Sequence, residues 1–539
     1  MAEFKSLLKN RLKNKEYYPL YLILAVNVIY FALVIACYPG FETDDYLLFS
    51  LIKNNPYPVA VNPYEAFFFF LRPVSYFTFY IDSIFWLYSP VMMKAFSLLL
   101  HLIFTGSFYL LLYKGSALFN IKFNRVMAGV VLLLLTFHPD VSIWIIWIAN
   151  RTELLYMLFY SLSLLSAAEY LLKKRQENLY LYAYAAFYLL SILSKAQPLH
   201  LPLLILLAIW VLREKFDKEK ISAIKKVSLA LTVIAILFVA ANFMLFSQKS
   251  VFFQYLYKKP FLMAGVLLYS VFPFWAENIY SFFVHNKLYA LTAVITAASA
   301  AVVYLRKERM KRKYAGYLIV FLLIIFIPRI TLDPINRINS IQIFWVFTAL
   351  YFIGNKYYHK MKSAIIFTAA AYFSISVFYN IVSYGLHKKY IAENMAQIDR
   401  FNNRYDLSKE KIVVLTALNN VLVPSQTYYN KNGAFGSYDI MLSPVYVFHQ
   451  MYSWKGLKAT PPLVKIRVDA DICTIENPDP EVKLYGNFAE GNRAGFSLVD
   501  MQKFPDSQSM KLCRIRIPQK YLHPGYKLVY YDGEQWKEL

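Results

Sequence analysis

Charged residues are scarce in this sequence. They make up 17% of 539 residues, whereas 58% of positions are hydrophobic and 18% are aromatic. Soluble globular domains carry about a quarter charged residues, so this chain has too little polar surface to enclose its apolar residues in water. The apolar content also excludes an intrinsically disordered chain. The composition therefore predicts an integral membrane protein rather than a soluble enzyme.

Cysteine is rare as well. Cys37 lies inside an apolar run, while Cys473 and Cys513 lie in the C-terminal part of the chain. These two could form one disulfide if that part is extracytoplasmic, because disulfides persist only in oxidising compartments. No cysteine and histidine spacing typical of a zinc finger is present.

Acidic residues are outnumbered, 33 against 57 basic ones, so the formal net charge is +24. Of these, 37 basic and 17 acidic residues precede Gly385, which places +20 of the charge among the apolar runs. The positive-inside rule produces such an excess of Lys and Arg between membrane helices. The charge therefore requires no nucleic-acid partner.

Long apolar runs predict a polytopic α-helical membrane protein. A basic stretch over residues 1–17 precedes the first run, about 18–38, which is too long for a signal-peptide core and has no small-residue cleavage site after it. We therefore predict a retained helix with a cytoplasmic N-terminus. Further runs lie near 91–113, 126–138, 152–172, 179–194, 198–212, 227–246, 286–305, 315–330, 340–354 and 363–385.

The segment 261–284 decides the topology. Treating it as a re-entrant or surface-lying segment broken at Pro273 keeps every basic cluster on the cytoplasmic side: 173–175, 213–226, 306–313 and 356–362. The prediction is then about eleven transmembrane helices in residues 1–385. Residues 386–539 are predicted to form an extracytoplasmic β-rich or α+β domain, because strand-like segments at 411–415, 464–468 and 511–517 alternate with Pro, Gly and Asn clusters.

Three acids stand in the first predicted outer loop, within the sequence Phe41-Glu-Thr-Asp-Asp-Tyr46. Carboxylates close to the hydrocarbon region are costly and usually functional. Asp44 or Asp45 could act as a general base on a hydroxyl, or the two could hold a divalent cation such as Mg²⁺ or Mn²⁺. A solvated acidic loop is the alternative.

An ordered series of short motifs follows these acids. It consists of Leu71-Arg-Pro73, Phe137-His-Pro-Asp140, Trp147-Ile-Ala-Asn-Arg-Thr-Glu-Leu-Leu155, Leu193-Ser-Lys-Ala-Gln-Pro198 and Asn336-Arg-Ile-Asn-Ser340. Over residues 15–345 the series resembles the GT-C superfamily of membrane glycosyltransferases. It is most similar to the protein O-mannosyltransferases that carry tetratricopeptide repeats, and to their bacterial relatives. Asn150 stands where that family has Gly, Ala196 where it has Glu, and the repeats are absent, which leaves the sugar and the acceptor open.

This resemblance implies an activity and assigns residues to it. The activity is transfer of a sugar from a polyprenyl-phosphate donor to an acceptor hydroxyl of a protein, lipid or glycan, outside the cytoplasmic membrane. Asp44 or Asp45 matches the catalytic acid, Arg151 and Glu153 match the Gly-Arg-x-acid element, and Arg337 matches the arginine of an outer turn.

The chemistry of a lipid phosphate supports the arginines independently. A guanidinium offers a planar fork for phosphate oxygens and stays charged near a low-dielectric boundary. The positive-inside rule expects few cations at the outer ends of helices, yet four arginines are predicted there: Arg72, Arg151, Arg329 and Arg337. Lys195 is a similar candidate, though it offers only a point charge. Snorkelling to lipid headgroups is the alternative role for each.

Three further residues are given supporting roles. Glu153 is interpreted as an acid near a helix start or as the partner that orients Arg151, His138 as a hydrogen-bonded packing residue, and Glu277 as an acid that borders the site or lies in a solvated loop. Two other functions stay open: a transporter or flippase for lipid-linked sugars, and an inactive scaffold that binds glycans. An oligosaccharyltransferase is disfavoured because its Trp-Trp-Asp motif is absent from the C-terminal region.

Overall fold

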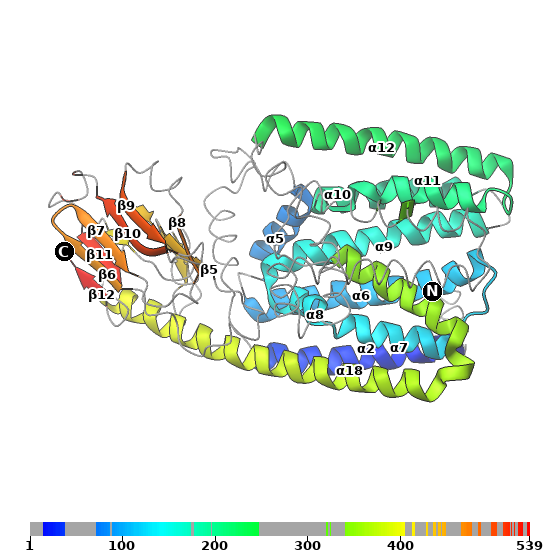
Figure 1. Cartoon of the computed structure of the whole chain (residues 1–539), viewed down its shortest axis with the longest axis horizontal. Coiled ribbons are helices and arrows are strands. Elements are labelled where there is room, and N and C mark those ends of the chain that lie inside the picture. Colours follow the sequence, from blue (N-terminus) through cyan, green and yellow to red (C-terminus); the bar gives the residue numbers. More distant parts are fainter. Residues whose placement is uncertain are drawn as a thin grey trace, which may run out of the picture.

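The computed structural model describes residues 15–37, 72–86, 89–173, 177–195, 197–246 and 340–404, and little beyond these ranges except β-strands between residues 412 and 538. The α-helices, labelled as in Figure 1, are α2 (Tyr18–Cys37), α5 (Pro73–Phe85), α6 (Pro90–Leu118), α7 (Arg125–Thr136), α8 (Pro139–Ile146), α9 (Arg151–Leu172), α10 (Asn178–Ser194), α11 (Leu201–Leu212), α12 (Lys218–Phe246) and α18 (Ser340–Arg404). Short 3₁₀ helices precede α2, α9 and α11: η1 (Lys15–Tyr17), η2 (Ile148–Asn150) and η3 (Gln197–His200).

Proline and one capping side chain set where several helices begin. Pro73, Pro90 and Pro139 stand at the starts of α5, α6 and α8, where the missing N–H has no intrahelical partner to lose. Helix α7 begins after Asn124, whose side-chain oxygen accepts hydrogen bonds from the backbone N–H groups two and three residues on, at 3.1 Å each. Such a cap satisfies N–H groups that the helix itself leaves unpaired.

The described helices show a multi-pass helical membrane protein. The helices that are long and apolar enough to cross a bilayer are Lys15–Cys37, Pro90–Leu118, Ile148–Leu172, Lys218–Ala240 and Ser340–Phe378. Helices α7 and α8, bent by 59° at their junction, together make a sixth candidate. The predicted runs 286–305 and most of 315–330, and the segment 261–284, lie outside the described residues. The predicted total of about eleven spans therefore stays a prediction.

Helix α9 lies at the centre of the described bundle. In its apolar window 78% of residues are buried, against 22% in that of α12, and α9 packs along both α6 and α10. Its core contacts include polar ones: the Tyr160 hydroxyl accepts a hydrogen bond from the Trp345 indole of α18 at 2.8 Å. Hydrogen bonds of this kind connect helices inside a membrane, where the hydrophobic effect does not.

Two glycines allow helices to approach closely. A Cβ atom on Gly129 of α7 would lie 2.8 Å from the Cβ atom of Pro19 in α2, and one on Gly354 of α18 would overlap the end of the Met127 side chain in α7. Small residues serve this purpose at helix interfaces in membranes. The approach of α7 to α2 therefore depends on the absence of a side chain at Gly129, whereas at Gly354 the flexible Met127 side chain could move aside.

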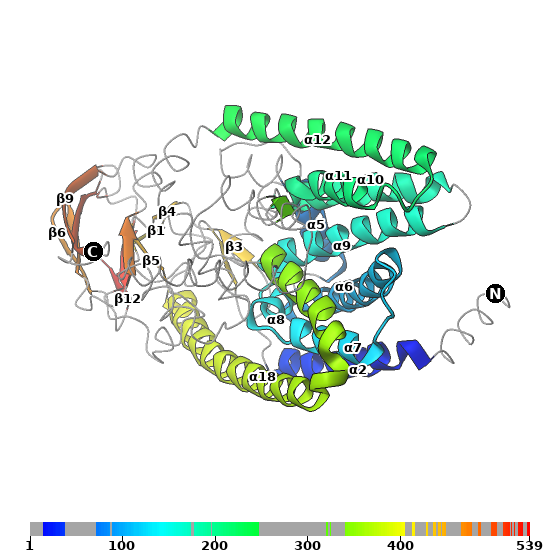
Figure 2. The same cartoon turned by 45° about the vertical axis from the view of Figure 1, so that its right-hand side comes forward.

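Helix α18 doubles back along the bundle. At Met361 the backbone leaves the helical region (φ −127°, ψ 23°). Before this bend, the Tyr351 hydroxyl accepts a hydrogen bond from a backbone N–H at the start of α7 (3.4 Å). After it, the Asn380 side chain donates to the Phe137 carbonyl at the other end of α7 (3.2 Å). The two runs predicted in this region therefore lie on opposite sides of a reversal in one long helix (Figure 2).

The described basic clusters gather at one end of the bundle. Hydrogen bonds join them in pairs: Arg125 to the Lys15 carbonyl (3.1 Å), Asn355 to the Lys122 carbonyl (2.9 Å) and Lys220 to the Lys173 carbonyl. The first turn of α9, with Arg151, lies at the opposite end (Figure 1). This separation is the one that the positive-inside rule requires of alternating helices.

The C-terminal region contains β-strands beyond the end of α18. They are β1 (Ile412–Leu415), β2 (Thr427–Tyr429), β3 (Phe435–Ser437), β4 (Ile440–Leu442), β5 (Val445–Phe448), β6 (Lys465–Asp469), β7 (Ile472–Glu476), β8 (Lys483–Gly486), β9 (Ser497–Lys503), β10 (Met510–Arg516), β11 (Lys527–Tyr531) and β12 (Trp536–Glu538). Two four-stranded sheets have the orders β12-β11-β1-β4 and β6-β7-β10-β9. Strand β1 pairs parallel to β11 and β4, while the second sheet is antiparallel.

The strands confirm the three segments predicted as β, which correspond to β1, β6 and β10. One boundary differs from the prediction, because α18 continues as a helix to Arg404, past residue 385. Cys473 and Cys513 lie on the neighbouring strands β7 and β10, but the register places Cys473 opposite Ile515 and Cys513 opposite Ile475. The two cysteines are therefore not directly opposed. An extracytoplasmic domain over 386–539 stays a prediction.

Candidate functional site

The structure describes part of the predicted site. The predicted residues that it describes are Arg72, His138, Arg151, Glu153 and Lys195. Those that lie outside the described residues are Asp44, Asp45, Glu277, Arg329 and Arg337. The described residues form the framework of the site, which surrounds the first turn of α9.

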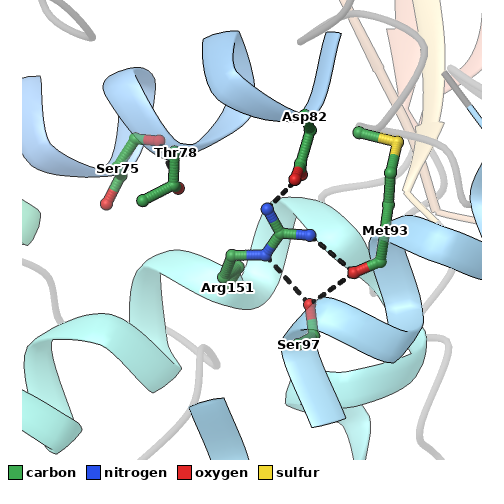
Figure 3. Close-up of polar contacts among 6 residues, drawn as sticks. All are labelled: Ser75, Thr78, Asp82, Met93, Ser97 and Arg151. Carbon is green, nitrogen blue, oxygen red and sulfur yellow. Dashed lines mark hydrogen bonds and ion pairs between the residues drawn. The ribbon is translucent and has the colours of Figure 1, made fainter. Parts of the chain in front are cut away.

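Arg151, the first residue of α9, is fully buried and bonded to α5 and α6 (Figure 3). One terminal nitrogen forms an ion pair with Asp82 of α5, and the other donates to the Met93 carbonyl of α6 at 2.7 Å. Its Nε atom donates to the Ser97 hydroxyl at 2.9 Å, and Ser97 itself donates to the Met93 carbonyl at 3.2 Å. Arg151 therefore joins three helices through one side chain.

The surroundings of this ion pair exclude water. Both side chains are 0% exposed, and the guanidinium carbon lies 5.3 Å and 5.1 Å from the ring centres of Phe79 and Phe96. Burial raises the pKa of the Asp82 carboxyl, because removal from water penalises the charged form more than the Arg151 guanidinium favours it. Each of the three guanidinium nitrogens of Arg151 has an acceptor, whereas the Oδ1 atom of Asp82 has no hydrogen-bond partner among the described residues. The pair is therefore satisfied on its cationic side and only in part on its anionic side, which makes its burial costly.

Asp82 is a residue that reasoning from the sequence missed. Of the two interpretations of Glu153, the acid near a helix start agrees with its position in the first turn of α9. The other, a partner that orients Arg151, does not agree, because the ion pair of Arg151 is with Asp82 and Glu153 bonds to Lys195 and Ser340. A single carboxylate within the apolar stretch 74–87 was the available signal, since an acid among such residues needs a partner. Lys94, fully buried beside Met93, was missed as well.

Glu153, in the first turn of α9, is almost completely buried and bonds to two other segments. Its Oε1 atom forms an ion pair with Lys195, which directly follows α10, and its Oε2 atom accepts a hydrogen bond from the hydroxyl of Ser340, the first residue of α18, at 2.9 Å. The Lys195 ammonium also lies 5.9 Å from the centre of the Tyr156 ring. Both carboxylate oxygens of Glu153 therefore have a partner.

Helix α5 also contacts the end of α10, beside Lys195. Arg72 precedes its first residue, and the Ser75 hydroxyl donates to the Ser194 carbonyl at the end of α10 (3.0 Å), next to Lys195. Arg72 is half-buried. The Arg-Pro motif thus begins a helix that contacts both the Arg151 and the Lys195 segments.

His138 caps helix α8. Its Nδ1 atom accepts a hydrogen bond from the Asp140 N–H at 3.2 Å, and Pro139 follows it as the first helical residue. The ring is fully buried and packs edge-on against Phe347 of α18 at 6.1 Å. This geometry agrees with the predicted packing role of the His-Pro motif.

Four motifs far apart in the sequence thus meet at one end of the bundle. They are the Arg-Pro helix α5, the Arg-Thr-Glu turn of α9, the Ser-Lys end of α10 and the Ser340 start of α18, and ion pairs and hydrogen bonds join them. The His-Pro start of α8 packs against Phe347, further along α18. Among the described residues, no three His, Cys, Asp or Glu side chains come close enough to hold a metal ion. The predicted metal candidates, Asp44 and Asp45, lie outside that part of the chain.

Comparisons with family models, curated proteins and solved structures found no match to this chain.

Proposed function

We propose that this protein is a membrane glycosyltransferase that transfers a sugar from a polyprenyl-phosphate donor to an acceptor hydroxyl. The observation that supports it most is the meeting of the motif segments around Arg151 and Glu153. These segments are among those on which the GT-C resemblance depends, and the most distant bonded pair that joins them, Glu153 and Ser340, is 187 residues apart in the sequence. Connections on one side of a membrane share one end of any multi-pass bundle, so the specific support is that ion pairs and hydrogen bonds join these motif residues directly.

The position of this end supports the proposed membrane side. The described basic clusters lie at the opposite end, which the positive-inside rule assigns to the cytoplasm. In the proposal the N-terminus is inside, and the Arg151 end and the C-terminal strands are outside the cytoplasmic membrane. A lipid-linked donor presents its phosphate at such a boundary.

The proposed reaction is an inverting transfer. Asp44 or Asp45 accepts the proton of the acceptor hydroxyl, its oxygen forms a bond to the anomeric carbon, and the bond from that carbon to the phosphate oxygen breaks. Polyprenyl phosphate leaves with the electron pair. Arg337 stabilises the charge that develops on the phosphate, the electrostatic contribution that is usually largest. Arg151, already paired with Asp82, contributes by holding the surrounding helices.

The test is transfer by purified protein in lipid nanodiscs. Radiolabelled polyprenyl-phosphate sugars are supplied with peptide, lipid and glycan acceptors, with Mg²⁺, with Mn²⁺ or with a chelator. We expect Asp44→Asn or Asp45→Asn to abolish transfer while leaving the melting temperature unchanged. Glu42→Gln, in the same loop, is the matched control and keeps its activity. Normal turnover in both aspartate variants would refute the mechanism.

A second measurement separates transfer from transport. In sealed vesicles, a flippase moves the lipid-linked sugar between leaflets without releasing polyprenyl phosphate, whereas a transferase consumes it. A scaffold does neither and only binds. Movement of intact donor without any transfer would overturn the proposal in favour of a transporter.

A further inference from the structure

The bend of α18 lies against the connection between α6 and α7, at the end of the bundle that carries the basic clusters. The Asn355 side chain, just before the bend, donates to the Lys122 carbonyl of this connection at 2.9 Å. Arg125, at the start of α7, donates to the Lys15 carbonyl of η1 at 3.1 Å. Three segments far apart in the sequence therefore form one surface at this end.

This surface, which we call the basic bend, carries exposed cations without ion pairs. Over residues 15–17, 118–126 and 354–364 the sequence has six Lys and Arg against one acid, Glu16. Five of these cations are exposed and, among the described residues, take part in no ion pair: Lys15, Lys122, Arg125, Lys360 and Lys362. The positive charge of the basic bend is therefore not neutralised by neighbouring side chains of the described chain.

Large apolar side chains are exposed among these cations. Phe119 is 45% exposed, Ile121 40% and Met361 52%. Phe119 and Ile121 come just before Lys122, and Met361 stands between Lys360 and Lys362. Cations beside apolar side chains match a phospholipid, because its charged headgroup adjoins its hydrocarbon chains.

We propose that the basic bend binds a phospholipid with a negatively charged headgroup, in the leaflet at this end of the bundle. The cations bind the headgroup, and the exposed apolar side chains contact the acyl chains. A free anion such as phosphate would use the cations alone and leave Phe119, Ile121 and Met361 without a partner. This inference is independent of the proposed transfer reaction.

Another connection at the same end of the bundle provides the comparison. The segment between α11 and α12 also has three exposed cations, Arg213, Lys215 and Lys218, but three acids alternate with them in the sequence. Its local charge is therefore zero. A general attraction of basic segments to an anionic membrane would involve both connections, whereas a lipid site at the basic bend involves only one.

The test is thermal unfolding in nanodiscs of phosphatidylcholine that contain increasing fractions of phosphatidylglycerol. A lipid that binds the folded state raises the melting temperature, so the phosphatidylglycerol fraction at half of the rise measures its affinity. The variant Lys122→Gln with Lys360→Gln and Lys362→Gln should increase this fraction about a hundredfold, because each cation that faces an anionic lipid changes the affinity about fivefold. Its titration should therefore no longer saturate.

The matched control is the variant Arg213→Gln with Lys215→Gln and Lys218→Gln. It makes the same change of charge in the balanced connection, and we expect it to keep the wild-type titration. An equal loss of the rise in both glutamine variants would overturn the proposal, because it would show a general attraction to the anionic membrane. The melting temperature of each variant in pure phosphatidylcholine is its own reference, so a loss of folding stability is not counted as a loss of binding.

Two further measurements complete the test. Arginine at the three lysine positions of the basic bend keeps the charge, so we expect this variant to retain the rise in melting temperature, and its loss would overturn the proposal. Inorganic phosphate added to pure phosphatidylcholine nanodiscs should leave the melting temperature of the wild type unchanged. A rise as large as that with phosphatidylglycerol would assign the surface to a soluble anion and would overturn the lipid site.

Discussion

Replacement of Asp82 by asparagine is expected to destabilise the helical bundle strongly. Asp82 and Arg151 are both 0% exposed, and the carboxylate is the anionic partner that the structure gives Arg151. The substitution replaces the carboxylate with a neutral amide, so the buried guanidinium charge loses an anionic partner and keeps neutral acceptors such as Ser97 and Met93. Removing one partner of a buried ion pair costs about 3–5 kcal/mol, which corresponds to a fall of roughly 5–15 °C in melting temperature.

The assay is thermal unfolding in nanodiscs, followed by tryptophan fluorescence at one fixed scan rate. Glu177→Gln is the matched control, because it makes the same change of carboxylate to amide in the exposed Lys173–Glu177 pair at the other end of the bundle (3.7 Å; 43% and 39% exposed). Exposed pairs contribute about 0–1 kcal/mol, so this control should shift the midpoint little.

The double variant Asp82→Leu with Arg151→Met completes the experiment. It removes both charges and fills the space with apolar side chains, which is often neutral or stabilising for a buried pair. We expect it to recover most of the stability lost in Asp82→Asn. Equal unfolding midpoints for Asp82→Asn and Glu177→Gln would refute the reasoning. A double variant that unfolds at as low a temperature as Asp82→Asn, or at a lower one, would refute it too.

Two further predictions concern packing and topology. Gly129→Ala should cost about 1–3 kcal/mol, because the new Cβ atom lies 2.8 Å from Pro19, whereas Gly106→Ala, with no atom within 4 Å, should keep the wild-type midpoint of thermal unfolding. A cysteine at Lys122, in a chain lacking Cys37, Cys473 and Cys513, should react with a membrane-impermeant maleimide only after cells are opened. Labelling of this cysteine in intact cells would contradict the proposed orientation.

The positions of most helices could be predicted from the sequence, because a membrane helix must be a continuous apolar run. The residue at which such a helix ends is harder to predict. Helix α18 was predicted to end near residue 385, where the apolar run ends, but it continues to Arg404. No proline or glycine occurs between residues 386 and 404, so nothing in the chain stops the helix when it leaves the apolar region.

The partners of the buried charges could not be predicted in the same way. Arg151 and Glu153 were recognised from their motif, but Asp82 lies 69 residues before Arg151 and Ser340 lies 187 residues after Glu153. Such pairs depend on which helices pack together, and a helix pattern in one sequence carries little information on that. The His138 cap could be predicted, because it involves only neighbouring residues.

The length of α18 after its bend has a consequence for how the chain leaves the membrane. From Met361 to Arg404 the helix rises about 65 Å, whereas the hydrocarbon core of a bilayer is about 30 Å thick. Roughly half of this segment therefore lies beyond the hydrocarbon region as a helical stalk. The chain leaves the bilayer as a continuous helix rather than as an irregular linker, and the β-strands follow that helix in the sequence.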